Sequence, residues 1–430
     1  MKNVKNKHAL FLSILMIFSF IIAGCQQNPT PTTVSVIEPT QILEPQNKGG
    51  TIIIGLSDAP VSLDPADHRS RQSETVLRNM FDALVTRDSR SGVHLQLAES
   101  LKWNDEKTLE IKLKEGVKFH DNSTMTAEDV VFTFERIIKP DQIEYPEVHS
   151  SPRAGLIAPL ESIEKVDDLT VLMHFSYPWP VAEQMLVHQQ IVPKAYFAKV
   201  GTEGFIAHPI GTGPFKFVSS TSGFNEVVME RFDDYYGGAT ELSPVGNACT
   251  DKIIFRVIPE ASTRAAAILA GEVQIIQAVP NDLVNRLEAD PSITVKTAPG
   301  TQPKWLELNV NKAPFNEIKV RQALNYAIDK NLLISEIYDG RAIELAGPLS
   351  PYNSYADQEL QPYAYDLDKA KSLLAEAGWA DTNDDGLVDK DQQPLSFVID
   401  TLEEHRNLAE AIASLYQQAG IDASVRFWEF

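Results

Sequence analysis

Oxygen-bearing side chains late in the sequence are spaced like the donors of a calcium-binding loop. They alternate with other residues and include a glycine at the sixth position, as in the first part of an EF-hand: Asp381, Asn383, Asp385, Gly386 and Asp389. The twelfth position holds Gln392 where an EF-hand has a bidentate glutamate, and no flanking pair of helices is evident. The pattern favours a solvated hairpin turn, and a calcium site stays the alternative.

A glycine-rich segment ending in lysine, IGTGPFK at 210–216, raises the question of phosphate binding. A phosphate-binding loop needs four residues between its glycines and then Gly-Lys-Ser/Thr. Here one residue separates Gly211 from Gly213, and Pro214 removes a backbone amide that would face the phosphate. We therefore predict a structural role for this segment.

Signatures of hydrolases are missing from the sequence. It contains no G-x-S-x-G and no H-E-x-x-H, and its nine histidines show no metal-ligand spacing. A pair of catalytic carboxylates stays open, because the chain has 59 acidic residues. We predict that the protein is not an enzyme and has no cofactor and no metal, and keep a secreted hydrolase as the alternative.

The segment 108–140 shows which elements could position a binding site. Apolar and charged residues alternate over 109–114, which indicates a strand with one buried face. Thr126 and Asp129 form the pattern of a capping box, which opens a helix that Pro140 ends. Patterns elsewhere predict a strand at 51–56, helices at 73–85, 320–337, 368–377 and 407–418, strand or turn segments at 169–175 and 192–197, and extended crossings at 293–297 and 305–309.

The stretch GVKFHDNSTMTAEDVVFTFERI resembles the signature of the peptide-type extracellular solute-binding proteins, the capture components of ABC importers. Further stretches match the same family in the same order: SLDPADHRSRQSETVLRNMFDALVTRD at 62–88, IGTGPFKF at 210–217, NKAPFNEIKVRQALNYAIDK at 311–330 and YDLDKAKSLLAEAGW at 365–379. Together they cover nearly everything from Gly49 to Phe430.

This resemblance implies an α/β fold with two lobes, of the type II periplasmic-binding-protein class, which closes about a hinge. Residues 49–300 then form the first lobe, with a small inserted subdomain at about 88–208, and residues 301–430 form the second lobe. Members of the family continue beyond the position that corresponds to Phe430. The second lobe is therefore expected to be incomplete, without the aspartate that pairs with a peptide's amino terminus in the peptide binders.

The resemblance also implies that the protein captures a peptide-like solute between its lobes and delivers it to a membrane permease. A non-peptide solute, such as an oligosaccharide, a metal chelate or haem, and a role as a ligand sensor stay open. Arg69 and Arg71 lie where the family has ligand-facing residues, and a guanidinium there could bind a carboxylate or a carbonyl. Trp305 and Asn309 are the other ligand-binding candidates. Solvated charge or plain packing is the alternative for these residues.

The N-terminal residues have the build of a secretory signal. Three lysines within the first seven residues precede an apolar run over 9–22, which is short for a membrane-spanning helix. The run ends in Ile-Ala-Gly-Cys, which resembles a bacterial lipobox. We predict a signal peptide at 1–24, lipidation of Cys25 and a disordered linker to residue 48. The protein would then be held by lipid on the extracytoplasmic face of the membrane or in the periplasm.

Charge and cysteine content limit the partners. The chain has a formal net charge of −21, so nucleic acid is a poor partner. Cys249 is the only thiol besides Cys25, so the mature chain has no intramolecular disulfide. We expect a monomer whose partners are its solute and an ABC permease.

Overall fold

The computed structural model describes residues 49–89, 91–242, 245–298, 300, 303–353 and 355–428. The predicted signal peptide, Cys25 and the linker to residue 48 lie outside the described residues. Within the described ranges, no helix is long and apolar enough to cross a membrane.

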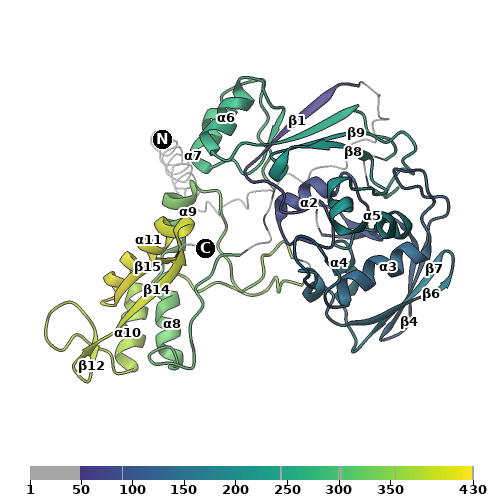
Figure 1. Cartoon of the computed structure of the whole chain (residues 1–430). Coiled ribbons are helices and arrows are strands. Elements are labelled where there is room, and N and C mark those ends of the chain that lie inside the picture. The colour runs from purple at the N-terminus through teal and green to yellow at the C-terminus, as the bar shows by residue number, and fades with distance from the viewer. Residues whose placement is uncertain are drawn as a thin grey trace, which may run out of the picture. The chain divides into compact units, whose positions relative to one another are not determined.

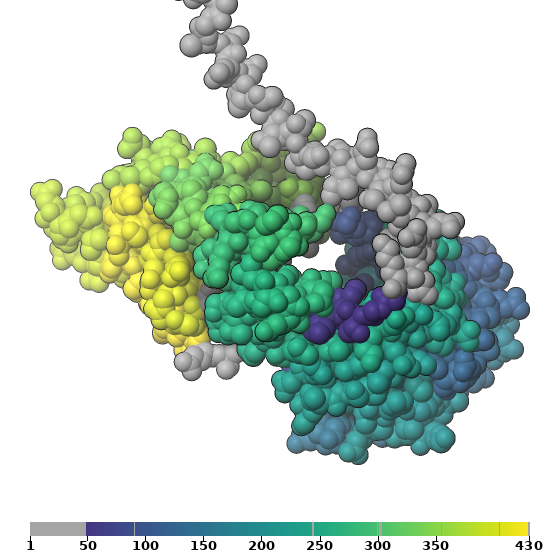
Figure 2. Space-filling view, turned by 90° about the horizontal axis from the view of Figure 1, so that it is seen from above, coloured from purple at the N-terminus to yellow at the C-terminus, as the bar shows by residue number. Residues whose placement is uncertain are grey.

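One sheet joins the start of the described chain to residues 215–276. Its strand order is β11-β1-β10-β9-β8; β1 is parallel to β10 and β11, and β9 is antiparallel to its neighbours. The strands are β1 Thr51–Leu56, β8 Phe215–Ser220, β9 Glu226–Arg231, β10 Lys252–Val257 and β11 Ile275–Ile276, and the helices α6 Ala261–Leu269 and α7 Asn281–Glu288 follow β10 and β11. In Figure 2 the purple surface of β1 adjoins teal surface from later segments. Because β1 is an inner strand, the loop that leaves its end starts from a fixed point.

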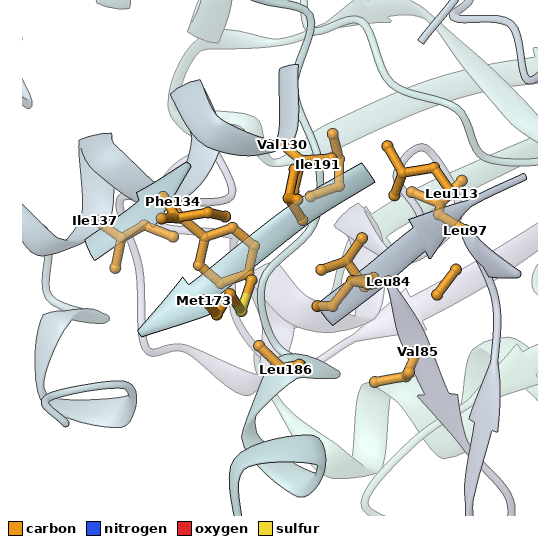
Figure 3. Packing of buried hydrophobic residues seen from close by; sticks show 14 of the residues in the cluster. Leu84, Val85, Leu97, Leu113, Val130, Phe134, Ile137, Met173, Leu186 and Ile191 are labelled. Carbon is orange, nitrogen blue, oxygen red and sulfur yellow. The ribbon is translucent and has the colours of Figure 1, made fainter. Parts of the chain in front are cut away.

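A second, antiparallel sheet has the order β4-β5-β7-β6. Its strands are β4 Ala98–Asp105, β5 Thr108–Leu113, β6 Leu160–Asp167 and β7 Thr170–Phe175, and next to it are the hairpin β2 Val85–Arg87 with β3 Val93–Leu95 and the short helix α4 Ala182–Leu186. Helix α3, Ala127–Ile138, packs on β6 and β7 (Figure 1). Phe134 of α3 lies against Met173 of β7 in a dry core (Figure 3).

The predicted capping box of α3 is confirmed. The backbone N–H of Thr126 donates to Asp129 Oδ2 at 2.8 Å, and the Thr126 side chain bonds in return to the first turn. This cap fixes where α3 begins, and therefore which of its residues face the sheet and which face the loop after β1.

Helix α2, Arg71–Leu77, is shorter than the predicted helix at 73–85. Just after its end, residues 79–81 contact the glycine segment at 210–216. The N–H of Gly213 donates to the carbonyl of Met80 at 2.9 Å, and a Cβ added to Gly211 would lie 2.2 Å from that oxygen. Only glycine allows the two backbones to come this close. The segment thus packs against the end of α2, a contact between residues far apart in the sequence.

The last part of the described chain forms its own core, whose members all come from residues 306–425. The parallel strands β14 Ser396–Leu402 and β15 Asp422–Trp428 pack on α11, Arg406–Gln418, and α8 packs on α10 (Figure 1). The remaining elements are α8 Ile318–Tyr326, α9 Lys330–Tyr338, α10 Leu367–Glu376, β12 Asp389–Lys390 and β13 Gln393–Pro394. The single helix predicted at 320–337 is wrong, because Asp329 caps α9: its Oδ1 accepts from the N–H of Leu332 at 3.0 Å.

One other prediction also fails. Residues 194–207, where a strand or turn was predicted to begin at Val192, form helix α5, Lys194–Ala207. Pro193 precedes it, and Gly201, whose φ of 68° is not helical, divides it into two helical pieces that bury Phe197 and Phe205. The segments 293–297 and 305–309 are not paired in a sheet, and their role as extended crossings stays a prediction. The boundary at 300 and the inserted subdomain stay predictions.

Candidate functional site

The loop between β1 and α2, residues 57–70, contains Arg69 and leads directly to Arg71, the first residue of α2. It folds around Asp64, whose side chain is fully buried. Asp64 Oδ1 accepts from the N–H of Ala66 at 2.9 Å, and its own N–H donates to the hydroxyl of Ser62 at 3.1 Å. These short-range bonds are typical of aspartate in turns, and they give the loop one compact conformation.

A buried ion pair ties this loop to α3. Arg136 Nη2 lies 2.6 Å from Asp64 Oδ2, and Nη1 lies 3.3 Å from Oδ1, so the pair is bidentate. The guanidinium also lies over the ring of Phe197, 3.8 Å from the ring centroid. Both charged side chains are at most 4% exposed. Because neither charge reaches water, each depends on the other.

A second buried network holds the end of the loop. Arg153 Nη2 lies 2.5 Å from both His68 Nε2 and Glu74 Oε2, and its Nη1 donates to the carbonyl of His188. Burial and the charge of Arg153 lower the pKa of His68 to about 4, so this imidazole is neutral at pH 7 and accepts from Arg153. Burial opposes ionisation of Glu74, but His188 and Arg153 outweigh it and hold the pKa of its carboxyl well below the usual range.

Arg69 and Arg71 stand on this framework and are exposed. Between them, Ser70 is the N-cap of α2 and accepts from the N–H of Ser73 at 3.3 Å. The backbone on both sides of the two arginines is therefore fixed, while their side chains face solvent. Guanidinium groups held in this way suit a ligand that carries carboxylates or carbonyl oxygens.

Trp305 and Asn309 lie in a segment with alternating exposure. Leu306 and Leu308 pack against the 306–425 core, whereas Trp305 is 67% exposed and Asn309 is also exposed. Asn309 uses its side chain locally, because its Oδ1 accepts from the N–H of Asn311 at 3.2 Å. Their alternation with two core residues puts Trp305 and Asn309 on the face of this segment that points away from the core. Their role as ligand contacts stays a prediction.

The calcium-like loop uses its oxygens internally. Thr382 donates to Asp389 through its hydroxyl, at 2.7 Å, and its N–H, at 3.0 Å, while Asp381 Oδ2 accepts from the N–H of Gly386 at 2.9 Å. Among the described residues, no group of three or more His, Cys, Asp or Glu side chains is arranged to hold a metal ion. The bonds made by Thr382 and Gly386 are those of a closed hairpin turn.

The residues of the framework were not identified from the sequence. A signal for Arg136 exists, because Asp129, Thr133 and Arg136 recur at i, i+4 and i+7 and form a polar stripe on α3. All three are buried. A polar stripe on an otherwise amphipathic helix could have indicated a buried partner, but nothing local to α3 points to Asp64 in a distant loop.

Comparisons with known proteins agree on one family. The family model for "Bacterial extracellular solute-binding proteins, family 5 Middle" matches residues 92–430. Oligopeptide-binding protein AppA of Bacillus subtilis is 28% identical, over 98% of this chain and 76% of AppA. Glutathione-binding protein GsiB of Pectobacterium atrosepticum is 32% identical, over 76% of this chain. The chain spans 61% of the length of GsiB, less than two thirds.

Solved structures of similar proteins confirm the predicted two-lobed α/β architecture. Bacillus subtilis AppA in complex with a nonapeptide matches with a TM-score of 0.68 and 29% identity, over 90% of this chain and 75% of AppA. NikZ of Campylobacter jejuni in complex with Ni(L-His) matches with a TM-score of 0.67 and 25% identity, over 88% of this chain and 73% of NikZ.

Proposed function

Because this chain belongs to the bacterial extracellular solute-binding proteins of family 5, we propose that it captures a peptide-like solute outside the membrane for an ABC importer. The observation that carries the proposal is the likeness to AppA along 98% of the chain. A peptide is extended and rich in carbonyl oxygens, and it ends in a carboxylate. The exposed Arg69 and Arg71 on their rigid loop suit such a ligand.

Binding between the two lobes, with closure around the solute, follows from the family's architecture. A solute shifts the equilibrium between open and closed arrangements only by its preference for the closed one. Small-angle scattering of the protein with and without its solute is expected to show compaction. An unchanged scattering profile at saturating solute would contradict this part of the proposal.

Recovery of bound molecules tests the proposal directly. The chain, purified in mild detergent, is incubated with a mixture of synthetic di- to nonapeptides, glutathione and Ni(L-His), and the retained molecules are identified by mass spectrometry. Retention of intact peptides is the expected result. Retention of glutathione or Ni(L-His) alone would favour the non-peptide alternatives that GsiB and NikZ represent. Cleaved peptides would indicate a hydrolase.

Matched variants then locate the site. Arg69→Ala and Trp305→Ala are expected to lower the affinity for the retained peptide by about tenfold each, a typical effect for a charge-assisted hydrogen bond or an aromatic contact. The control variants are Lys139→Ala, which removes an exposed cation just after α3, and Tyr177→Ala, which removes a 54% exposed ring. Equal affinities in all four variants would show that these candidates are not part of the site.

We also propose that diacylation of Cys25 holds the protein at the outer face of the membrane, from which it delivers solute to a permease. The apolar run before Cys25 and the lipobox-like Ile-Ala-Gly-Cys support this anchor. More than one acyl chain is needed for stable anchoring, since a single chain gives only marginal membrane binding. Membrane fractionation of a Cys25→Ser variant tests the anchor.

A further inference from the structure

The segment 149–153, which we call the strap, holds the β1–α2 loop through alternate residues. Three strap residues each contact a different loop residue: His149 contacts Asp67, the Ser151 hydroxyl donates to the carbonyl of Ala66, and Arg153 contacts His68. Ser151 and Arg153 are buried, whereas the side chain of His149 is 38% exposed. The strap therefore has two inner contacts and one at the surface.

The two ring nitrogens of His149 both face acceptors. Nε2 lies 2.8 Å from Asp67 Oδ1, and Nδ1 lies 2.8 Å from the carbonyl oxygen of Glu147. Neither of these oxygens can donate a hydrogen, because one belongs to a carboxylate and the other to a peptide group. A neutral imidazole carries a single N–H, so it can make only one of the two bonds. Only the imidazolium can make both bonds at once.

We propose that His149 is a positioning residue that orders the β1–α2 loop when it is protonated, so that the affinity for solute depends on external pH. The inference rests on the proposed function, because the loop matters for affinity only if Arg69 and Arg71 bind the solute. When His149 loses its proton, one of its two bonds is lost, and where that bond is the one to Asp67 the strap holds the loop only through Ser151 and Arg153. No other contact of the strap involves a group that changes charge near neutral pH, since His68 is already neutral there.

The charges around the pair set the direction of the effect. Two further charged groups lie near the pair of His149 and Asp67. Glu147 lies near His149, and Asp64 lies near Asp67, but Arg136 neutralises Asp64. The bond to the Glu147 carbonyl and that to Asp67 raise the pKa of His149. Burial raises the pKa of Asp67, and this outweighs the opposing bond from His149. We call the bond between protonated His149 and Asp67 the latch. It is formed below about pH 6.5 and is lost as the pH rises through the raised pKa of His149. It is also lost in acid, where Asp67 takes up a proton.

A second histidine offers a matched control. His94 of β3 also has both ring nitrogens near acceptors, with Asp88 Oδ2 and Glu241 Oε2 at 3.0 Å each. The bonds to Asp88 and Glu241 raise its pKa as well. Neither of its partners belongs to the strap or to the β1–α2 loop. A His94→Gln variant thus removes an imidazole with two carboxylate partners and leaves the bond between His149 and Asp67 unchanged.

Hydrogen exchange measures the order of the loop without any solute. Mass spectrometry follows the amides of Ala66 and Asp67, which are both bonded to Asp64. The exchange rate of the His149→Gln variant is divided by that of the wild type at the same pH, which cancels the intrinsic pH dependence of exchange. We expect a ratio of about three to ten at pH 6, as for a partly exposed charged hydrogen bond, falling to about one at pH 9. The His94→Gln variant should give a ratio near one throughout.

Two further variants keep the test decisive if His149→Gln is poorly folded. His149→Lys keeps the cation at pH 9, so its loop should stay protected there. Asp67→Asn should lower the pKa of His149, measured by NMR titration of the imidazole, towards that of a solvent-exposed histidine. A ratio of one for His149→Gln at pH 6, or a His149 pKa that Asp67→Asn leaves unchanged, would overturn the proposal.

Solute affinity is measured separately with the peptide retained in the capture experiment. The wild type should bind it more tightly at pH 6 than at pH 9, and His149→Gln should bind equally at both. A ratio of His149→Gln to wild-type exchange that is the same at pH 6 and at pH 9 would contradict the latch even if peptide is captured. A complete failure to retain peptide at either pH would contradict the proposed function, and the exchange data would still decide whether the latch orders the loop.

Discussion

Removal of Arg136 gives the sharpest test of how the loop is held. An Arg136→Met variant keeps the aliphatic part of the side chain and leaves Asp64 as a buried charge without its partner. The side chains of both residues are at most 4% exposed, and the pair has two hydrogen bonds, of 2.6 and 3.3 Å. Breaking a buried pair from one side typically costs about 3–5 kcal/mol of the free energy of unfolding. The lost contact with the ring of Phe197, at 3.8 Å, adds to this loss, so we expect at least about 3 kcal/mol.

The double variant Asp64→Asn/Arg136→Met separates the charge from the packing. Asparagine can still accept from the N–H of Ala66, as Asp64 does now at 2.9 Å, but it carries no charge. What remains is an amide without its former partner, at a cost of about 1–3 kcal/mol. The double variant should therefore be more stable than Arg136→Met alone.

Urea unfolding provides the assay, with hydrogen exchange of α3 to assign the transition to this part of the chain. Lys139→Met is the control, because Lys139 follows α3 directly and makes an exposed pair with Glu135 at 2.7 Å. Its loss should cost well under about 1 kcal/mol. If Arg136→Met unfolds at the same urea concentration as Lys139→Met, the ion pair does not hold the loop.

Other changes have equally definite outcomes. Gly211→Ala should give little soluble protein, because its Cβ would lie 2.2 Å from a backbone oxygen, whereas Gly155→Ala, with nothing within 4 Å, should behave as the wild type; native gels and circular dichroism compare the two. The folded-state pKa of His68, about 4, lies below the unfolded value of about 6.5, so folding favours its neutral form and stability falls as the pH drops from 6.5 to 4, by up to about 3 kcal/mol. A His68→Gln variant should lose this part of the pH dependence in thermal unfolding, and an unchanged profile would refute the assignment. Cys25→Ser should move the protein from the membrane to the soluble fraction, and its persistence in washed membranes would rule out the lipid anchor.

Local patterns predicted several elements correctly. The strand at 51–56, the capped helix after Thr126 and the helix at 407–418, seen as α11, follow from spacing and capping within a single stretch. The failures share a physical cause. Helix α2 gives way to a turn in which the carbonyls of Asn79 and Met80 accept from the distant glycine segment, and the helix predicted at 320–337 is split where Asp329 caps α9. Apolar periodicity does not indicate a contact with a distant part of the chain, nor a capping residue within an apolar run.

The candidate site divides in the same way. The family resemblance suggested Arg69 and Arg71 as candidates after the first strand, and the five stretches that match one family indicated the class of protein. The sequence could not show what holds these arginines, because each framework contact joins residues far apart in the chain: Asp64 to Arg136, Glu74 to Arg153 and Asp67 to His149.

The sequence alone thus determined several elements, the family and the chemical type of the exposed residues. These depend on side-chain properties and on short-range spacing. Only the tertiary structure decided which charges are buried, which are paired and which histidines face two acceptors. Those states depend on desolvation and on the distance between groups that the chain brings together only when it folds.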